Sequence, residues 1–181
     1  APAPQAVPEQ PSTTPQDVAP ARPRLFVLSA GVNDYADRRL RLAFAVPDAS
    51  SIAQALQVTG RGIYSDVDIK VLRDADVTRE KLDGAFREVA ARALPADAFL
   101  FFIAGHGKTV DGRYYFVPRD LMLGDDRSPA ALDAAVRKQG IAQEQWQQWF
   151  ASVPARRSVI LLDTCESGTI IDDETQNLER G

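Results

Sequence analysis

The chain contains one histidine and one cysteine, and each follows an apolar run and lies beside glycine or a turn-forming stretch. His106 lies in FLFFIAGHG, and Cys165 lies in SVILLDTCESG. An imidazole next to a thiol can take its proton, and the resulting thiolate is a strong nucleophile. These residue types in this placement indicate nucleophilic catalysis, with Cys165 as the nucleophile and His106 as its acid and base.

Glycines around the histidine fit the same hypothesis. They carry no side chain, so the backbone on both sides of His106 can approach a substrate closely. The amides of Gly107 and Cys165 are candidate donors to a developing oxyanion, and loss of one such donor typically lowers a rate by about 10²–10³. The alternative is structural, because a lone cysteine is often a small buried hydrophobe and a lone histidine is often a hydrogen-bonded core residue.

The elements that must position these residues follow from the apolar patterns. Strands are predicted by continuous or alternating apolar residues at 24–32, 67–72, 98–105, 113–118 and 158–163. Helices are predicted by apolar stripes over 46–60, 77–94 and 141–153. Alternating strands and helices predict an α/β fold, a three-layer sandwich with a mostly parallel sheet and helices on both faces. Sites in such sheets lie at the carboxyl ends of the strands, so His106 and Cys165 meet if their strands are neighbours.

Composition narrows the class of protein. The chain has 181 residues, 45% hydrophobic and 25% charged, which suits one globular domain with a real core. Its net charge of −4 gives no reason to expect nucleic acid or an anionic membrane as a partner. No apolar run approaches the ~20 residues that span a bilayer. One cysteine cannot form an intrachain disulfide, and the compartment stays open between the bacterial cytoplasm and export.

Two regions differ sharply in composition. Residues 1–23 are rich in proline and nearly free of large apolar side chains, which predicts a disordered linker. Residues 24–181 carry the apolar patterns and form the predicted folded domain.

The motifs FFIAGHG and LLDTCESG resemble those of the caspase-like cysteine peptidases, most closely the metacaspase and orthocaspase branch. Residues 25–56 are similar to the opening of that domain, a strand leading through a loop to a helix with an Asp-Ala pair. The resemblance runs from residue 24 to the end. It implies a caspase-like fold, hydrolysis of protein or peptide substrates by a Cys165–His106 dyad, and no required cofactor.

Specificity is predicted from three small or acidic residues. Asp163 precedes the cysteine by two positions, which would place its carboxylate at the floor of the pocket for the substrate residue before the scissile bond. A carboxylate in that pocket attracts Arg or Lys and repels Asp or Glu. In metacaspases the matching aspartate is helped by the aspartate of the early helix, here Asp48, and Ala104 would line the same pocket. The alternatives are a turn role for Asp163 and pairing with a helix N-terminus for Asp48. CESG also occurs in legumain-like peptidases, which cleave after Asn, and Glu166 stands where metacaspases often carry His.

The resemblance implies three further properties. It allows calcium activation through acid-rich loops, although such loops are often simply solvated, and the candidate ligands are Asp120, Asp125, Asp126 and Asp172. Caspase-like domains continue past the large-subunit part, so a small-subunit segment is expected to complete the sheet and cover its edge. Arg180 predicts self-processing between Arg180 and Gly181, against the alternative of an arbitrary chain end.

Two other function classes stay open. The chain could be a catalytically silent caspase-like module that acts through protein–protein interaction. A flavodoxin-like nucleotide binder is the third possibility, but no Gly-rich phosphate loop follows the first predicted strand.

Overall fold

The computed structural model describes residues 22–165, with Cys165 described by its backbone. The strands are β1 (Leu25–Gly31), β2 (Val67–Arg73), β3 (Ala98–Val110), β4 (Arg113–Phe116), β5 (Ile141–Ala142) and β6 (Arg157–Cys165). The α-helices are α1 (Ala45–Thr59), α2 (Arg79–Arg92), α3 (Pro129–Gln139) and α4 (Gln143–Ser152), and short 3₁₀ helices are η1 (Arg38–Leu40), η2 (Gly60–Gly62) and η3 (Asp74–Asp76). The predicted linker over 1–23 lies almost wholly outside the described residues. Within 22–165, no helix combines the length and apolar character that crossing a membrane requires.

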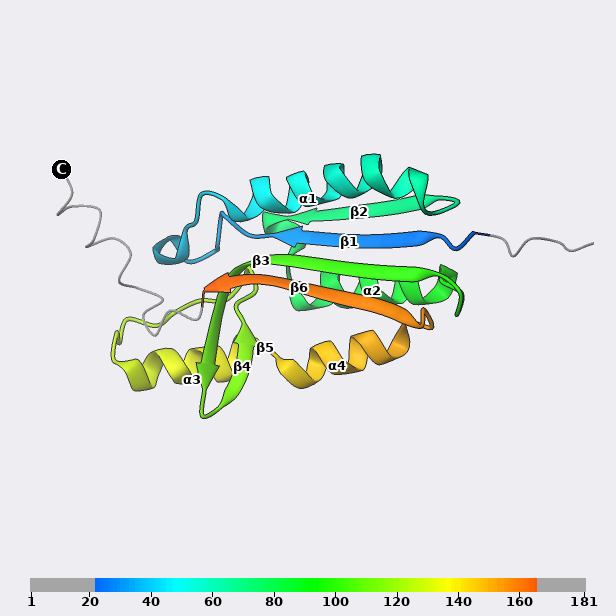
Figure 1. The fold of residues 1–181 in the computed structure, drawn as a ribbon. Helices are drawn as coiled ribbons and strands as arrows, with labels where there is room; N and C mark the ends of the chain where they lie inside the picture. The colour runs from blue at the N-terminus through cyan, green and yellow to red at the C-terminus, as the bar shows by residue number, and fades with distance from the viewer. Residues whose placement is uncertain (1–21, 166–181) are drawn as a thin grey trace, which may run out of the picture.

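One mixed sheet organises the fold (Figure 1). Its strand order is β2-β1-β3-β4-β5, and β6 pairs with β3. The pairs β1–β2, β1–β3 and β3–β6 are parallel, whereas β3–β4 and β4–β5 are antiparallel. The predicted parallel α/β sheet is therefore confirmed for its main body, and a small antiparallel extension is added to it.

The antiparallel extension follows from a two-residue turn. Asp111 and Gly112 join β3 to β4, and both have positive φ, 51° and 75°. Asp-Gly with positive φ at both positions is typical of a tight hairpin turn, which can only join antiparallel strands. The chain beyond Gly105 therefore stays in β3 as far as Val110, instead of leaving the sheet where the apolar run ends.

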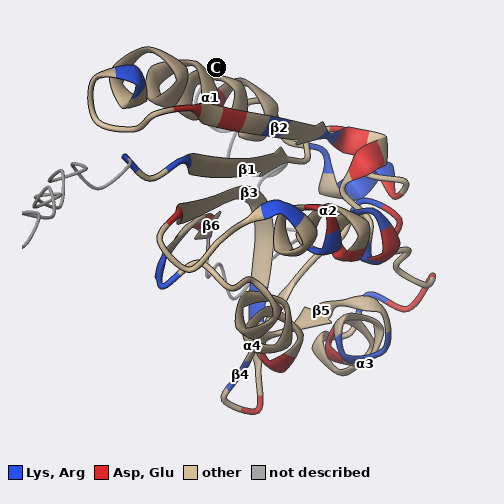
Figure 2. Cartoon of the chain, turned by 90° about the vertical axis from the view of Figure 1, so that its right-hand side faces the viewer, with Lys and Arg blue, Asp and Glu red and all other residues tan. Residues whose placement is uncertain are grey.

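Helices lie on both faces of the parallel part, with α1 on one side, against β1, β2 and β3, and α2 on the other (Figure 2). The apolar stripe predicted for α2 is confirmed, because Leu82, Phe86 and Val89 are buried. Thr78 caps this helix by accepting from the Lys81 amide. On the same side, the ring of Phe86 stacks on Trp149 of α4 at 5.3 Å between centroids. The largest core cluster therefore lies between the sheet and the layer of α2 and α4.

Helix α3 was not among the predicted elements: the sequence predicted an acid-rich loop over 119–128 and no element over 129–140. Its first turn begins at Pro129, after Ser128 accepts from the Ala131 amide as an N-cap. Leu132 and Val136, four residues apart, are buried against the core. Serine followed by proline and an apolar pair at helical spacing is a start signal that was present in the sequence.

Candidate active site

The backbone brings the histidine and cysteine motifs together. Strands β3 and β6 are parallel neighbours, and their register pairs His106 directly with Cys165. At His106, β3 changes partners, because residues 98–106 pair with β6 and residues 107–110 pair with β4. His106 therefore lies within its strand, not past its end as predicted, while Cys165 is the last residue of β6.

The imidazole of His106 is buried and held by a backbone carbonyl. Its side chain is 8% exposed, and Nε2 lies 2.9 Å from the Leu40 carbonyl oxygen. A carbonyl can only accept, so Nε2 donates and carries the proton. In the neutral ring, this hydrogen bond makes Nδ1 the basic nitrogen. The Leu40 carbonyl thus selects the tautomer in which Nδ1 can accept a proton.

Tyr35, which follows β1, supports the histidine from another direction. Its hydroxyl accepts a hydrogen bond from the His106 amide at 2.8 Å, and the two rings lie 5.2 Å apart. Burial raises the pKa of Tyr35, so the phenol stays neutral at physiological pH.

The glycines on either side of His106 make room for two tyrosines. A Cβ at Gly105 would lie 2.8 Å from the Tyr35 hydroxyl, and one at Gly107 would lie 2.7 Å from the Tyr114 hydroxyl. The Tyr114 hydroxyl in turn lies 2.9 Å from Oγ1 of Thr164, the residue before the cysteine. These contacts explain the glycines structurally, and their predicted role in approaching a substrate stays a prediction.

The residues predicted to set specificity lie along the same sheet edge. Ala104 pairs in register with Asp163, which is exposed. Ala104 itself is 1% exposed and belongs to a small apolar cluster with Ala49 of α1. Asp48 is half-buried and occupies the first turn of that helix, where a carboxylate also favours the positive end of the helix dipole. Ala104 therefore has Asp163 of β6 beside it in the sheet and packs against the first turns of α1, the helix that carries Asp48.

The acid-rich loop after β4 does not gather metal ligands. Within residues 22–165, no three His, Cys, Asp or Glu side chains group closely enough to hold a metal ion. Asp126 instead accepts from the Ser128 amide, and this hydrogen bond lowers its pKa. Asp172, the fourth candidate ligand, lies outside the described residues.

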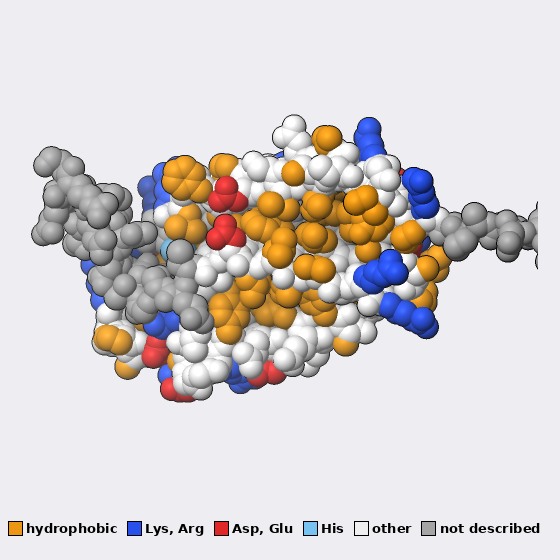
Figure 3. All heavy atoms as spheres, viewed as in Figure 1, with side chains coloured by type: hydrophobic (Ala, Val, Ile, Leu, Met, Phe, Trp, Pro, Cys, Tyr) orange, Lys and Arg blue, Asp and Glu red, His pale blue; other side chains and the backbone are white. Residues whose placement is uncertain are grey.

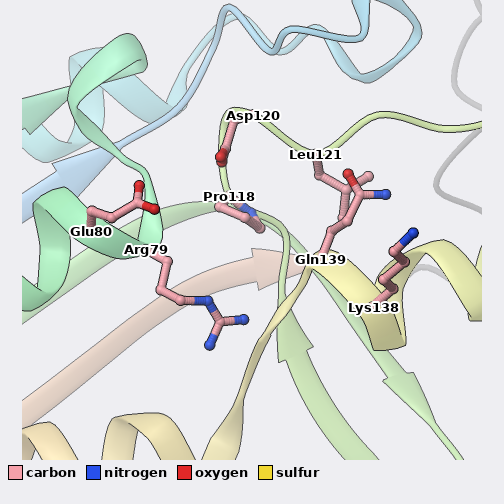
Figure 4. Close-up of a pocket in the computed structure, with 7 residues that line it drawn as sticks. All are labelled: Arg79, Glu80, Pro118, Asp120, Leu121, Lys138 and Gln139. Carbon is pink, nitrogen blue, oxygen red and sulfur yellow. The ribbon is translucent and has the colours of Figure 1, made fainter.

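Asp120 lies in a pocket of about 180 Å³ between α2, α3 and the loop after β4 (Figure 4). The lining residues are Arg79, Glu80, Pro118, Asp120, Leu121, Lys138 and Gln139. Two of them are cationic, and Figure 4 shows Arg79 reaching in from α2 and Lys138 lying on α3. The two cations offset the two carboxylates, Glu80 and Asp120, so the pocket has no excess of negative charge to bind calcium and gives the calcium prediction no support.

Comparison with known proteins decides the family. A family model of the caspase domain matches residues 25–180. The chain belongs to the caspase domain family. The family as a class consists of cysteine peptidases, and the predicted fold and resemblance are confirmed at that level.

A solved structure supports the fold of this caspase domain. The chain is similar to a protein of Geobacter sulfurreducens whose crystal structure is known, with 18% sequence identity and a TM-score of 0.61. The alignment covers 86% of this chain and 55% of the other, so the chain spans about half the length of that protein. No curated protein sequence matches the chain significantly.

Several residues of the site carried no signal in the sequence. Leu40 acts through its backbone carbonyl, which every residue possesses, and Tyr35 lies 71 residues from the histidine that it contacts. Arg180, the predicted processing site, and Glu166, which departs from the metacaspase pattern, lie outside the described residues.

Proposed function

We propose that this caspase domain is a cysteine endopeptidase in which His106 and Cys165 form the catalytic dyad. The observation that carries the proposal is their direct pairing in the register of β3 and β6. In a chain with one histidine and one cysteine, the pairing of these two residues at the edge where parallel sheets place their sites supports a chemical role for both.

The proposed reaction proceeds in two halves. Nδ1 of His106 takes the proton of the Cys165 thiol, and the thiolate attacks the carbonyl carbon of the scissile peptide. The imidazolium then gives the proton to the leaving amine as the C–N bond breaks, which leaves an acyl-thioester. Water, deprotonated by the same imidazole, hydrolyses the thioester and restores the thiol. Throughout, the Leu40 carbonyl would keep a proton on Nε2.

The amides of Gly107 and Cys165 are the proposed donors to the tetrahedral oxyanion. The Val117 amide donates to the His106 carbonyl, so Gly107 and Phe116 form a non-hydrogen-bonded pair in the antiparallel ladder. The Gly107 amide therefore points away from β4, toward the side of β3 where β6 runs. This direction supports, for Gly107, the role that the sequence predicts.

We infer cleavage after Arg or Lys. Asp163 is exposed beside the buried Ala104, and Asp48 lies on the neighbouring helix turn. Two carboxylates around a small residue favour a long cationic side chain and disfavour an acidic one. The same preference would allow self-processing after Arg180.

A small-subunit segment is the proposed partner of β6. Within the described residues β6 pairs only with β3, and its apolar residues Val159, Ile160, Leu161 and Leu162 are 38–49% exposed. Figure 3 shows hydrophobic side chains gathered on this face of the molecule. Parallel strands are normally covered on both faces and rarely left as apolar edges, so a further strand and its covering helices fit here.

A panel of peptides tests the proposed activity in the full-length protein. The peptides differ only in the residue before the scissile bond, which is Arg, Lys, Asn or Asp. We expect hydrolysis after Arg and Lys, no hydrolysis after Asp, and loss of all activity in Cys165→Ala. Preference for Asn would favour a legumain-like pocket, and no hydrolysis of any peptide would favour a silent interaction module.

Asp163→Asn sharpens the specificity test. Loss of a charged partner for the substrate side chain costs about 1.5–3 kcal/mol, so kcat/KM for the Arg peptide should fall about 10–100-fold. The variant should leave alkylation of Cys165 unchanged. An unchanged Arg preference would contradict the assignment of this pocket.

A further inference from the structure

A nearly buried ion pair lies next to the residue whose carbonyl holds the histidine. Asp37 is 5% exposed, and Arg39 binds it with two hydrogen bonds, Nη2 to Oδ2 at 2.6 Å and Nε to Oδ1 at 2.9 Å. Two-pronged pairing of this kind fixes the orientation of both side chains. Asp37 is the N-cap of the 3₁₀ turn η1, and Arg39 lies within this turn, which ends at Leu40.

The pair also attaches this turn to a distant loop. The Leu123 amide donates to Oδ2 of Asp37 at 3.0 Å. Arg39 donates to the carbonyl oxygens of Leu123 at 2.7 Å and Gly124 at 3.2 Å. Asp37 and Arg39 therefore lock η1 onto residues 123–124, which lie more than 80 positions further along the chain.

The Asp37–Arg39 ion pair and its bonds to residues 123–124 form a clamp on η1. Leu40 follows Arg39 in the sequence and contacts His106. Its amide donates to the Asp37 carbonyl at 3.0 Å, and its side chain is 1% exposed. Its own carbonyl accepts from Nε2 of His106 at 2.9 Å. The position of that carbonyl is thus set by a turn that the ion pair closes and anchors.

We propose that Asp37 and Arg39 are positioning residues that hold the Leu40 carbonyl against Nε2 and so keep His106 in the Nε2–H tautomer. The tautomer leaves Nδ1 as the base of the proposed peptidase reaction. The catalytic part of this inference rests on the proposed function, whereas the tautomer itself can be measured without any activity.

His106 is the one histidine of these 181 residues, so its signals can be assigned with a single variant. In a long-range ¹H–¹⁵N spectrum of the full-length protein, the His106 imidazole signals are those absent from His106→Gln, and their nitrogen shifts report the fractions of the two neutral tautomers. We expect wild type to be almost entirely Nε2–H. In Asp37→Asn and in Arg39→Met, the Nδ1–H fraction should rise to a readily measured share, and Arg39→Lys should fall between these variants and wild type because it keeps one charged contact.

A matched ion pair at the other end of the sheet provides the control. Asp97 is 4% exposed and pairs with Arg24 at 2.7 Å, but both residues lie just before the first residues of β1 and β3. Asp97→Asn should leave the tautomer of His106 at the wild-type value. An equal change in Asp97→Asn, or no change in the Asp37 and Arg39 variants, would overturn the proposal.

Kinetics separate this inference from the proposed function. With the Arg peptide, Asp37→Asn and Arg39→Met should lower kcat about tenfold or more and change KM less than about twofold, because a misplaced base affects the reaction more than binding. If the variants show the expected tautomer shift but the wild-type protein hydrolyses no peptide, the peptidase assignment is overturned and the positioning role stays intact. Hydrolysis with no tautomer shift in the variants would do the reverse.

Discussion

The two ends of the parallel strands, called here the amino edge and the carboxyl edge of the sheet, each carry a buried aspartate paired with an arginine. The two ion pairs have nearly the same chemistry but hold different parts of the chain. At the amino edge, the buried Asp97 accepts from the guanidinium and amide of Arg24 and from the Leu94 amide. At the carboxyl edge, the buried Asp37 accepts from Arg39 and from the Leu123 amide. The first ties the beginnings of two strands together, whereas the second ties a turn that contacts His106 to another loop.

The electrostatics of the two clamps are also alike in sign. Hydrogen bonds from Arg39, aided by backbone amides, outweigh burial and lower the pKa of Asp37 to about 2. At Asp97 burial acts to raise the pKa, but the hydrogen bonds from Arg24 and from two amides prevail and lower it. A clamp of the same chemistry can therefore serve stability alone or stability together with the geometry of a site, depending on what its turn touches.

The largest expected contrast between the edges is in catalysis. His106→Gln should lower kcat/KM by about 10⁴-fold or more, since removal of one member of a catalytic unit removes most of its effect. Asp97→Asn should change kcat/KM less than about twofold at a temperature where it is fully folded. Peptide hydrolysis with matched protein concentrations checks both, and a His106→Gln protein retaining a tenth of the activity would break the contrast.

Acid should weaken both clamps, because both depend on an ionised aspartate. A carboxylate whose folded-state pKa is depressed stabilises the protein above its unfolded value near 4, and this stabilisation is lost as the pH falls toward the folded value. Asp37 should contribute about 2 kcal/mol of the free energy of unfolding at pH 7, lost between about pH 5 and pH 2.

Urea denaturation at several pH values measures this loss. Both Asp37→Asn and Asp97→Asn should show a smaller acid-induced fall than wild type. Asp76→Asn offers a control, because its ion pair with Lys81 is long, at 3.8 Å, and more than half exposed. An acid-induced fall of wild-type size in Asp37→Asn would contradict the assignment of that pKa.

The smallest expected effect on stability is in the core between the sheet and α4. The Nε1–H of Trp146 is buried and has no hydrogen-bond partner among the described residues, whereas the Nε1–H of Trp149 donates to Asp83 at 2.7 Å. Trp146→Phe removes a donor that has no partner, whereas Trp149→Phe removes the hydrogen bond to Asp83. Trp146→Phe should therefore be the better tolerated change, by about 1 kcal/mol in the free energy of unfolding. Equal losses in Trp146→Phe and Trp149→Phe would show that ring packing alone decides.

The elements that build the sheet were predictable, and the contacts that orient the histidine were not. Continuous apolar runs and helical stripes locate β1, β3, β6 and α2 because burial dictates those patterns. The Asp111-Gly112 hairpin and the start of α3 at Ser128-Pro129 had local signals of their own. In contrast, the clamp on η1 joins residues more than 80 positions apart, and the Leu40 carbonyl is a backbone group that no residue type marks.

The proposed interaction between His106 and Cys165 can be tested most directly by alkylation of Cys165. Iodoacetamide reacts with the thiolate, and mass spectrometry of the digested protein follows the peptide that contains Cys165. If His106 takes the thiol proton, wild type at pH 6 should react at least about tenfold faster than His106→Ala, and the two should react equally once unfolded in urea. Equal rates in the folded proteins would contradict a Cys165–His106 dyad.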